Sequence, residues 1–158
     1  MHHSTGKILA NNMIVKVKRI DKSLPLPIYH TKGSVGCDLY ARVTTKIKPK
    51  SLGKIPTNVI IQTPVGFMFM LASRGSTPFK KGLMPANGVG IGDQDFCGEE
   101  DEYLAAVYNF TNKTVVVEKG ERIAQGIFIP VEIVKWKEVG SVEKVSRGGF
   151  GSTGGHKK

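Results

Sequence analysis

The sequence N-G-V-G-I-G-D-Q-D-F-C-G-E-E-D-E, residues 87–102, is the stretch around which the rest of this chain is organised. An apolar run with a glycine at every second position leads into two carboxylates, Asp93 and Asp95, and then into the aromatic ring of Phe96. Glycine lets the backbone approach a ligand closely because it has no Cβ atom. We expect a strand that ends at Asp93, where a carboxylate can take a proton from water and Phe96 offers a flat apolar face. From these residues alone, the alternative is an acidic surface hairpin.

The length and composition of the chain limit the kinds of protein that it can be. Its 158 residues, with a mass of 17.2 kDa, are enough for one domain with its own core. The sequence shows no signal-peptide pattern and no apolar run of membrane-spanning length, so we expect a cytoplasmic protein that is not in the membrane. Cys37 and Cys97 lack metal-site spacing, which predicts free thiols in a reducing compartment.

The formal net charge of +10 raises the question of nucleic-acid binding. The lysines and arginines are scattered in small groups, and no long basic run, aromatic RNA-binding signature or helix-turn-helix pattern accompanies them. A basic chain suits a small polyanionic substrate equally well. We therefore do not expect nucleic acid to be the main partner.

Short apolar or alternating segments, separated by Gly, Pro, Asn and Lys, dominate the chain. No segment shows a helical apolar stripe with caps, and neither an internal repeat nor a linker divides the sequence. The continuous apolar run at 66–72 predicts a strand that is buried on both faces. The pattern indicates a single all-β barrel or sandwich, with strands near residues 13–18, 43–47, 59–62, 66–72, 103–110, 115–118 and 122–137.

The end of the chain, R-G-G-F-G-S-T-G-G at residues 147–155, has a different composition. Such a glycine-rich segment cannot bury enough surface to fold alone, and we expect it to be mobile. Its composition also suits a clamp that closes over phosphate. Arg147 has a bidentate fork for phosphate oxygens, Ser152 and Thr153 have hydroxyls, the glycines can form an anion nest, and Phe150 can stack on a base. The alternative is a frayed terminus.

Two further stretches have related chemistry. In Ser73–Pro78, Arg74 follows the apolar strand directly and lies beside small and hydroxyl residues. In Gly120–Gly126, a turn leads into a strand that carries Gln125. Taken alone, the first stretch also fits a surface arginine in a turn, and the second an ordinary hairpin.

Together and in this order, these segments closely resemble the five motifs of the trimeric deoxyuridine triphosphatases. The third and fifth motifs are specific individually, whereas the others are specific mainly through their order and spacing. The resemblance extends over nearly the whole chain from Gly36 onward. The matching segments, from the first motif to the fifth, are Gly36–Ala41, Ser73–Thr77, Asn87–Gly98, Gly120–Gln125 and Arg147–Gly154.

The resemblance implies a jelly-roll-like, distorted β-barrel domain over residues 1–146 and a flexible arm over residues 147–158. It implies a homotrimer with three active sites between subunits. One chain would contribute motifs one, two and four, its neighbour the third motif, and the arm of the third chain the fifth. The implied reaction converts dUTP and water to dUMP and pyrophosphate, with Mg²⁺ bound to the triphosphate. This reaction keeps uracil out of DNA and supplies dUMP for dTTP synthesis.

The resemblance also implies a role for each matching residue. Asp93 would orient and deprotonate the attacking water, and Phe96 would pack on deoxyribose and exclude a 2′-hydroxyl. Asn87 and the backbone near Ile91 would read the uracil edge. Asp38 would support the metal indirectly, through water. The residues implied for the triphosphate are Arg74, Gly75, Ser76 and Gln125, and those for the closing clamp are Arg147, Phe150, Gly151, Ser152 and Thr153.

Three residues depart from the family pattern. Gly75 stands where the second motif has a serine, which removes a hydroxyl expected near the α–β bridging oxygen. The loss of one hydrogen bond to a charged group costs about 1.5–3 kcal/mol, so the enzyme would be slow unless Ser76 compensates. Gly92 stands where a β-branched residue usually precedes the catalytic aspartate, which would loosen the aim of Asp93. Phe96 replaces a tyrosine, keeping the ring and losing its hydroxyl.

Two other functions remain as alternatives. A related deaminase, acting on dCTP, shares the fold but uses a glutamate as general acid and base. The glutamates of this chain, Glu99, Glu100 and Glu102, lie somewhat too far along the sequence for that role. The second alternative is a binding protein that keeps the fold and regulates other macromolecules.

Overall fold

The chain is almost entirely β-structure in the computed structural model, which describes residues 13–142, 145–146 and 148–149. One short helix, α1, interrupts the strands at Thr77–Lys81. The strands in chain order are β1 Val17–Arg19, β2 Cys37–Tyr40, β3 Thr45–Ile47, β4 Leu52–Pro56, β5 Val59–Ile61, β6 Phe67–Ser73, β7 Leu83–Pro85, β8 Gly90–Gly92, β9 Leu104–Asn109, β10 Val115–Val117 and β11 Arg122–Pro130.

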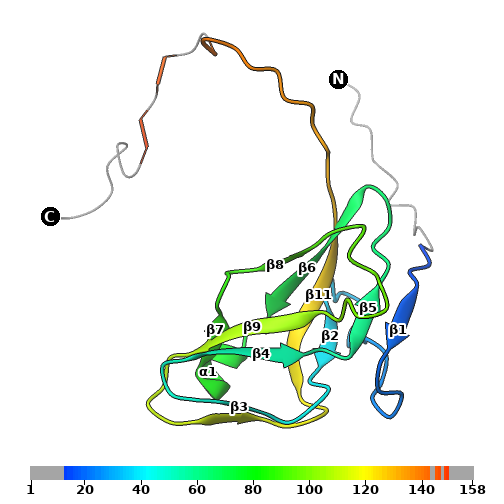
Figure 1. Cartoon of the computed structure of the whole chain (residues 1–158), viewed down its shortest axis with the longest axis vertical. Coiled ribbons are helices and arrows are strands. Elements are labelled where there is room, and N and C mark those ends of the chain that lie inside the picture. The colour runs from blue at the N-terminus through cyan, green and yellow to red at the C-terminus, as the bar shows by residue number, and fades with distance from the viewer. Residues whose placement is uncertain (1–12, 143–144, 147, 150–158) are drawn as a thin grey trace, which may run out of the picture.

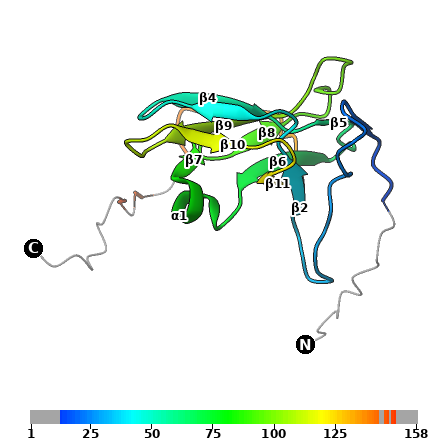
Figure 2. The same ribbon diagram turned by 90° about the horizontal axis from the view of Figure 1, so that it is seen from below.

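The strands form two layers. A four-stranded sheet in the order β2-β11-β6-β8 faces a three-stranded sheet in the order β4-β9-β7, and the pairs β1-β5 and β3-β10 complete the edges. Figure 1 shows the elements in place, and Figure 2 shows β4 and β9 above β6, β11 and β2. All strand pairs are antiparallel. The expected all-β, jelly-roll-like fold is confirmed.

The core lies between the two layers and is centred on Phe69, which is fully buried on β6. On this strand only Phe69 and Leu71 are buried, and their neighbours are partly exposed, so the prediction of a strand buried on both faces was wrong. The alternating pattern arises because successive side chains point to opposite faces of a sheet. Gly126 on β11 makes room for the Phe69 ring, since a Cβ atom there would lie 2.0 Å from the ring carbon Cζ.

Helix α1 was not predicted, although its local signals are present. A proline occupies its first turn, and Gly82 ends it in the left-handed conformation at φ 66°. Five residues are too few for an apolar stripe to be recognised. None of the helices in the described ranges is both long and apolar enough to span a bilayer.

Both cysteines are free thiols, as expected. Cys37 is buried on β2, and Cys97 is half-buried in the loop after β8. Burial raises the pKa of the Cys37 thiol, which keeps this group protonated and unreactive.

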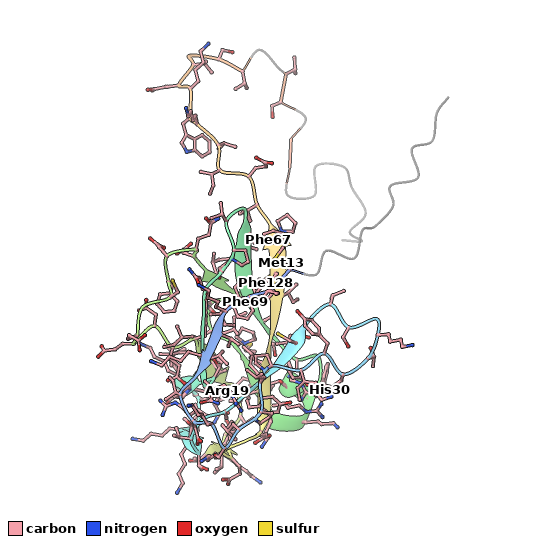
Figure 3. The ribbon with its side chains drawn as sticks, turned by 90° about the vertical axis from the view of Figure 1, so that its right-hand side faces the viewer. Met13, Arg19, His30, Phe67, Phe69 and Phe128 are labelled. Carbon is pink, nitrogen blue, oxygen red and sulfur yellow. The ribbon has the colours of Figure 1, made fainter. Side chains whose placement is uncertain are left out.

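The chain leaves the body of the domain after β11. We expected this strand to continue to residue 137, but it ends at Pro130, and residues 131–142 have no regular structure. Figures 1 and 3 show this segment projecting away from the two layers. Its apolar side chains are exposed, with Trp136 at 93% and Ile133 at 83%. The extended segment thus carries apolar surface that its own domain does not cover.

An apolar groove of about 430 Å³ lies on the flank of the domain near β1. Figure 3 shows Met13, Phe67 and Phe128 gathered at this flank. Tyr29 and Met13 are about half exposed there, so the groove is open to solvent in the single chain.

Candidate active site

A cleft of about 330 Å³ lies where the end of β6, the start of α1, β2 and β11 meet. We call it the arginine cleft. It contains a buried carboxylate, two guanidinium groups and several hydroxyl and amide groups, and its lining is polar. The residues that line it are His30, Ser34, Gly36, Asp38, Arg74, Gly75, Ser76, Arg122 and Gln125.

Asp38 organises the charges of the arginine cleft. Its Oδ1 accepts a hydrogen bond from Nε of Arg74 at 3.0 Å, and its Oδ2 accepts one from Nη1 of Arg122 at 3.1 Å. Nε2 of His30 lies 3.2 Å from the same Oδ2. Arg74 Nη1 also donates to the carbonyl of Arg122 at 3.2 Å. A carboxylate held in this way orients two cations toward one cleft, which is suited to a polyanion.

Two further polar side chains, those of Gln125 and Ser76, line this cleft. Gln125 donates from Nε2 to the carbonyl of Ser73 at 2.9 Å, which joins β11 to the end of β6. Gly36 permits this arrangement, because a Cβ atom there would lie only 2.9 Å from Oε1 of Gln125. Ser76 is the N-cap residue of α1, yet its side chain makes no capping hydrogen bond. Its hydroxyl is therefore available to a ligand.

A second cleft, of about 290 Å³, lies beside β8, and we call it the hairpin cleft. β8 pairs with β6 and ends at Gly92, so it delivers Asp93 to the edge of the sheet. Asp93 is exposed, and Phe96 follows in the same turn with 37% of its surface exposed. An exposed carboxylate beside an aromatic face can bind water and a flat ligand at once. The residues that line this cleft are Leu71, Asn87, Gly90, Ile91, Asp93, Phe96, Glu102, Tyr103 and Leu104.

The acidic loop that follows Phe96 is tied to the domain by ion pairs. Glu102 receives two hydrogen bonds from Arg42, at 2.9 Å from Nε and 2.8 Å from Nη2, and a third from the amide of Asn58 at 2.8 Å. The same interaction raises the pKa of Arg42. Lys18 pairs with Glu99 and lowers the pKa of that carboxyl. Two of the three glutamates therefore anchor the loop.

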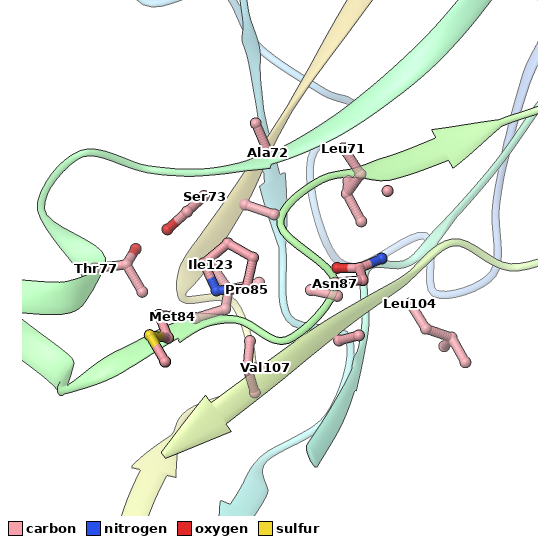
Figure 4. Close-up of a pocket in the computed structure, with 14 residues that line it drawn as sticks. Leu71, Ala72, Ser73, Thr77, Met84, Pro85, Asn87, Leu104, Val107 and Ile123 are labelled. Atoms are coloured by element: carbon pink, nitrogen blue, oxygen red, sulfur yellow. The ribbon is translucent and has the colours of Figure 1, made fainter. Parts of the chain in front are cut away.

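A small cavity of about 30 Å³ lies between β6, β7, β9 and β11. Figure 4 shows the hydroxyls of Ser73 and Thr77 on one side and the amide of Asn87 on the other. The lining of this cavity is mostly apolar, and Ser73, Thr77 and Asn87 are its polar residues. Asn87 lines both this cavity and the hairpin cleft, so its amide lies at their junction.

The structure divides the residues predicted from the sequence into two groups. The arginine cleft brings together Asp38, Arg74, Gly75, Ser76 and Gln125. The hairpin cleft brings together Asn87, Ile91, Asp93 and Phe96. Neither cleft contains a residue of the other. The clamp residues Arg147, Phe150, Gly151, Ser152 and Thr153 lie outside the described residues.

Sequence reasoning missed several residues of the two clefts. Arg122 lies within the fourth motif, so its position between Gly120 and Gln125 was an available signal. His30 and Ser34 reach the arginine cleft because the amide of Asp38 donates to the carbonyl of Ile28 at 2.9 Å. No local pattern indicates that pairing.

Comparison with known proteins identifies the family of the chain. The family model described as dUTPase matches residues 22–154. The chain belongs to the dUTPase family. The deoxyuridine 5′-triphosphate nucleotidohydrolase of Anaplasma marginale (strain St. Maries) is 38% identical over 146 residues, covering 89% of this chain and 97% of that protein. The enzyme of the same name from Desulfitobacterium hafniense (strain DSM 10664 / DCB-2) is 40% identical over 151 residues, covering 91% and 98%.

A solved structure shows the same fold. The crystal structure of dUTPase from Streptococcus mutans has a TM-score of 0.70 and 33% sequence identity, covering 76% of this chain and 98% of that one. The two departures at glycine have different surroundings in this dUTPase-family chain. A Cβ atom on Gly75 would meet nothing within 4 Å, whereas one on Gly92 would lie 2.3 Å from the hydroxyl oxygen of Tyr103.

The donor set of the described residues fits a metal that is carried by a substrate. No group of three or more His, Cys, Asp or Glu residues that could hold a metal ion occurs in the described ranges. Both carboxylate oxygens of Asp38 accept hydrogen bonds from arginine. Mg²⁺ usually keeps several waters and binds substrate phosphates, so it does not need a protein cage.

Proposed function

We propose that this chain is a dUTP nucleotidohydrolase, which converts dUTP and water to dUMP and pyrophosphate. The reaction removes dUTP, which keeps uracil out of DNA, and supplies dUMP for dTTP synthesis. The single observation that carries the proposal is the pair of clefts in a dUTPase-family chain: one holds oriented cations and hydroxyls, and the other an exposed aspartate beside an aromatic ring.

The arginine cleft binds the triphosphate. Arg74 supplies the main cation, held in place by Asp38 at 3.0 Å. The free hydroxyl of Ser76 and the amide of Gln125 bind further phosphate oxygens, and the open space at Gly75 lets the phosphate chain come close to the backbone. Interactions between charged groups and phosphate are the stronger class of hydrogen bonds, so most of the substrate affinity resides in this cleft.

The hairpin cleft binds the nucleoside and supplies the base. Asn87 and the backbone near Ile91 read the uracil edge, where a cytosine amino group would face donors. The ring of Phe96 packs on deoxyribose and excludes a ribose 2′-hydroxyl. Asp93 orients the attacking water and accepts its proton, which requires the exposure that this carboxylate has.

The active form is a homotrimer. In one chain the two clefts do not share a residue, so a complete site requires the arginine cleft of one subunit and the hairpin cleft of another. The exposed apolar segment at residues 131–142 and the apolar groove near β1 offer surface for neighbouring subunits to cover. The arm at residues 147–158 closes over the nucleotide from the third chain, through Arg147, Phe150, Gly151, Ser152 and Thr153.

When bound with the triphosphate, Mg²⁺ would supply charge neutralisation at the phosphate oxygens. Asp38 would hold the hydrated ion through water. The protein works in the cytoplasm, with dUTP as its ligand and without a membrane or nucleic-acid partner. Glu99 and Glu102 are engaged with Lys18 and Arg42, which supports the hydrolase over a deaminase.

One assay tests this proposal. The purified protein is incubated with each of dUTP, dCTP, dTTP, dATP and dGTP in Mg²⁺, and both pyrophosphate and ammonia are measured. We expect pyrophosphate from dUTP alone, and loss of that activity when Mg²⁺ is removed with EDTA. Ammonia from dCTP would instead show a deaminase. Absence of both products with every nucleotide would show a protein that has kept the fold without the reaction.

A further inference from the structure

Tyr103 packs beneath the loop at residues 93–98, which we call the catalytic loop, and its own contacts hold it in place. Its side chain is only 6% exposed. Its amide donates to the carbonyl of Val59 at 3.0 Å, and its carbonyl accepts from the amide and the hydroxyl of Thr57, at 3.0 and 2.7 Å. The Tyr103 backbone is therefore tied by three hydrogen bonds to the connection between β4 and β5.

The ring of Tyr103 packs between two other aromatic rings. Phe69 lies on one side, with ring centroids 5.0 Å apart at 62°. Phe96 lies on the other side, with ring centroids 5.2 Å apart at 72°. Both contacts have the edge-to-face geometry that aromatic pairs prefer. The backbone holds Phe96 only weakly, through a hydrogen bond of 3.4 Å from its amide to the carbonyl of Asp93. The orientation of the Phe96 ring therefore depends mainly on Tyr103.

The space that Tyr103 fills exists because residue 92 is glycine. A Cβ atom on Gly92 would lie 2.3 Å from the hydroxyl oxygen of Tyr103, 2.6 Å from its Cε1 and 2.8 Å from the carbonyl oxygen of Phe69. A β-branched residue cannot fit at position 92 while the Tyr103 ring occupies this space. The glycine and the tyrosine are thus complementary, and the loop is packed from below where the family pattern has a branched side chain.

The hydroxyl of Tyr103 adds little to this packing. In the described part of the chain, the side-chain oxygens of Tyr103 and Thr63 are buried without a hydrogen-bond partner of acceptable geometry. Burial raises the pKa of Tyr103; the nearby hydroxyl of Thr63 opposes the rise and the charge of Asp93 adds to it. A buried hydroxyl without a partner destabilises the folded state, so the useful part of Tyr103 is its ring.

We propose that Tyr103 is a positioning residue that sets the discrimination between deoxyribose and ribose by holding the ring of Phe96. This inference rests on the proposed function, in which Phe96 packs on the sugar. A Phe96 ring without its platform can turn away and leave room for a 2′-hydroxyl. Ribose then enters the site at little cost, and the sugar is held less firmly against the attacking water.

The test compares four variants with the wild-type protein. Tyr103→Val removes the ring, and Tyr103→Leu is a second ring-free variant in case the first does not fold. Tyr103→Phe keeps the ring and removes the unpartnered hydroxyl. Leu83→Ala is the matched control, because Leu83 is fully buried on β7, pairs with Asn109 at the far end of β9 and does not line the hairpin cleft. Its melting temperature should fall as that of Tyr103→Val does.

Two quantities are measured: kcat/KM for dUTP against UTP, and the amide hydrogen exchange of residues 93–98. In the ring-free variants we expect the dUTP preference to fall by about tenfold or more and the loop amides to exchange faster. Tyr103→Phe and Leu83→Ala should retain the wild-type preference and loop exchange. Wild-type values of both in the ring-free variants would overturn the inference. A wild-type protein that does not hydrolyse dUTP would refute the proposed function, whereas the loop exchange would still decide whether Tyr103 holds the loop.

Discussion

Nε of Arg74 donates a hydrogen bond of 3.0 Å to Oδ1 of Asp38, a carboxylate that is nearly buried at the centre of the arginine cleft. The contact joins β2 to the end of β6, two strands that are not neighbours in their sheet. It orients the guanidinium group toward the open side of the cleft before any substrate arrives. A cation that is oriented in advance loses less conformational freedom when phosphate binds.

Asp38→Asn should therefore impair substrate binding more than the chemical step. The variant loses the charge that orients Arg74, so we expect KM for dUTP to rise about ten- to a hundredfold, with a smaller change in kcat. Steady-state kinetics measures both. In an Arg74→Ala background the same substitution should cost little more, because the two residues act through one interaction. Additive losses in the double variant would contradict this role.

Gly75→Ser should raise turnover. The site has open space around Gly75, so the added hydroxyl fits without displacing a neighbour. One further hydrogen bond to the phosphate oxygens would increase kcat by about tenfold or more.

Ser76→Ala should lower kcat, since the Ser76 hydroxyl makes no capping hydrogen bond that could account for its presence. Unchanged turnover in Gly75→Ser, together with a large loss in Ser76→Ala, would show that Ser76 already replaces the missing hydroxyl.

Asp93→Asn should abolish hydrolysis while leaving the fold and dUTP binding intact. General-base catalysis and the positioning of water would be lost together, so we expect kcat to fall at least about a thousandfold. Calorimetry with a non-hydrolysable dUTP analogue measures binding separately. Glu100→Gln, in the same loop, is the matched control for loss of one negative charge and should retain activity. Near-normal turnover of Asp93→Asn would remove this residue from the mechanism.

Mixing two inactive variants should restore activity if subunits share the site. Arg74→Ala destroys the arginine cleft and Asp93→Asn the hairpin cleft, so random co-assembly of equal amounts leaves about one site in four with both clefts intact. We expect about a quarter of wild-type activity after co-refolding. A mixture of Arg74→Ala and Ser76→Ala, both in the same cleft, should stay near the activity of its components. An inactive first mixture would indicate that one chain forms the whole site.

The stability of the protein should depend on Asp21 in a pH-dependent way. Lys119, at 2.6 Å, and then Ser23 lower the pKa of Asp21 below its usual value near 4. Because the folded state favours the ionised carboxylate, its stabilisation is present above pH 4 or so and is lost as the pH falls further. Asp21→Asn should thus lower the melting temperature at pH 7 and have little effect near pH 2. An equal effect at both pH values would show that charge is not involved.

The fold class and most strand positions could be predicted because short strands separated by turns leave local patterns of apolar and turn-forming residues in the sequence. The apolar run at 66–72 and the glycines near Asp93 indicate strands directly from neighbouring residues, although the alternating burial around Phe69 and Leu71 does not show in a run that is apolar throughout. Helix α1 escaped because five residues carry no measurable periodicity. The end of β11 at Pro130 was missed because the apolar pattern continues past it, into a segment that does not pack on its own domain.

The candidate site was predictable where its motifs are continuous, as for Arg74 and Asn87 to Phe96. His30 and Tyr103 were not, because their roles arise from contacts between distant parts of the chain. His30 is brought to Asp38 by a backbone bridge at Ile28, and Tyr103 matters only through its packing on Phe96. From the sequence, Gly92 was expected to loosen the aim of Asp93. In the structure the Tyr103 ring fills the space that a side chain at position 92 would occupy, so the glycine does not leave a gap there.

The uncovered segment at residues 131–142 has a consequence for how this protein is handled. In the proposed homotrimer, neighbouring subunits would bury Trp136 and Ile133, which are 93% and 83% exposed in the single chain, and the melting temperature would then follow mass action. Dilution of such a trimer would lower its free energy of unfolding, as a denaturant does. At low concentration the exposed, extended and apolar segment is also a template for unwanted strand pairing. For such a trimer, a melting temperature would be interpretable only together with the protein concentration at which it was measured.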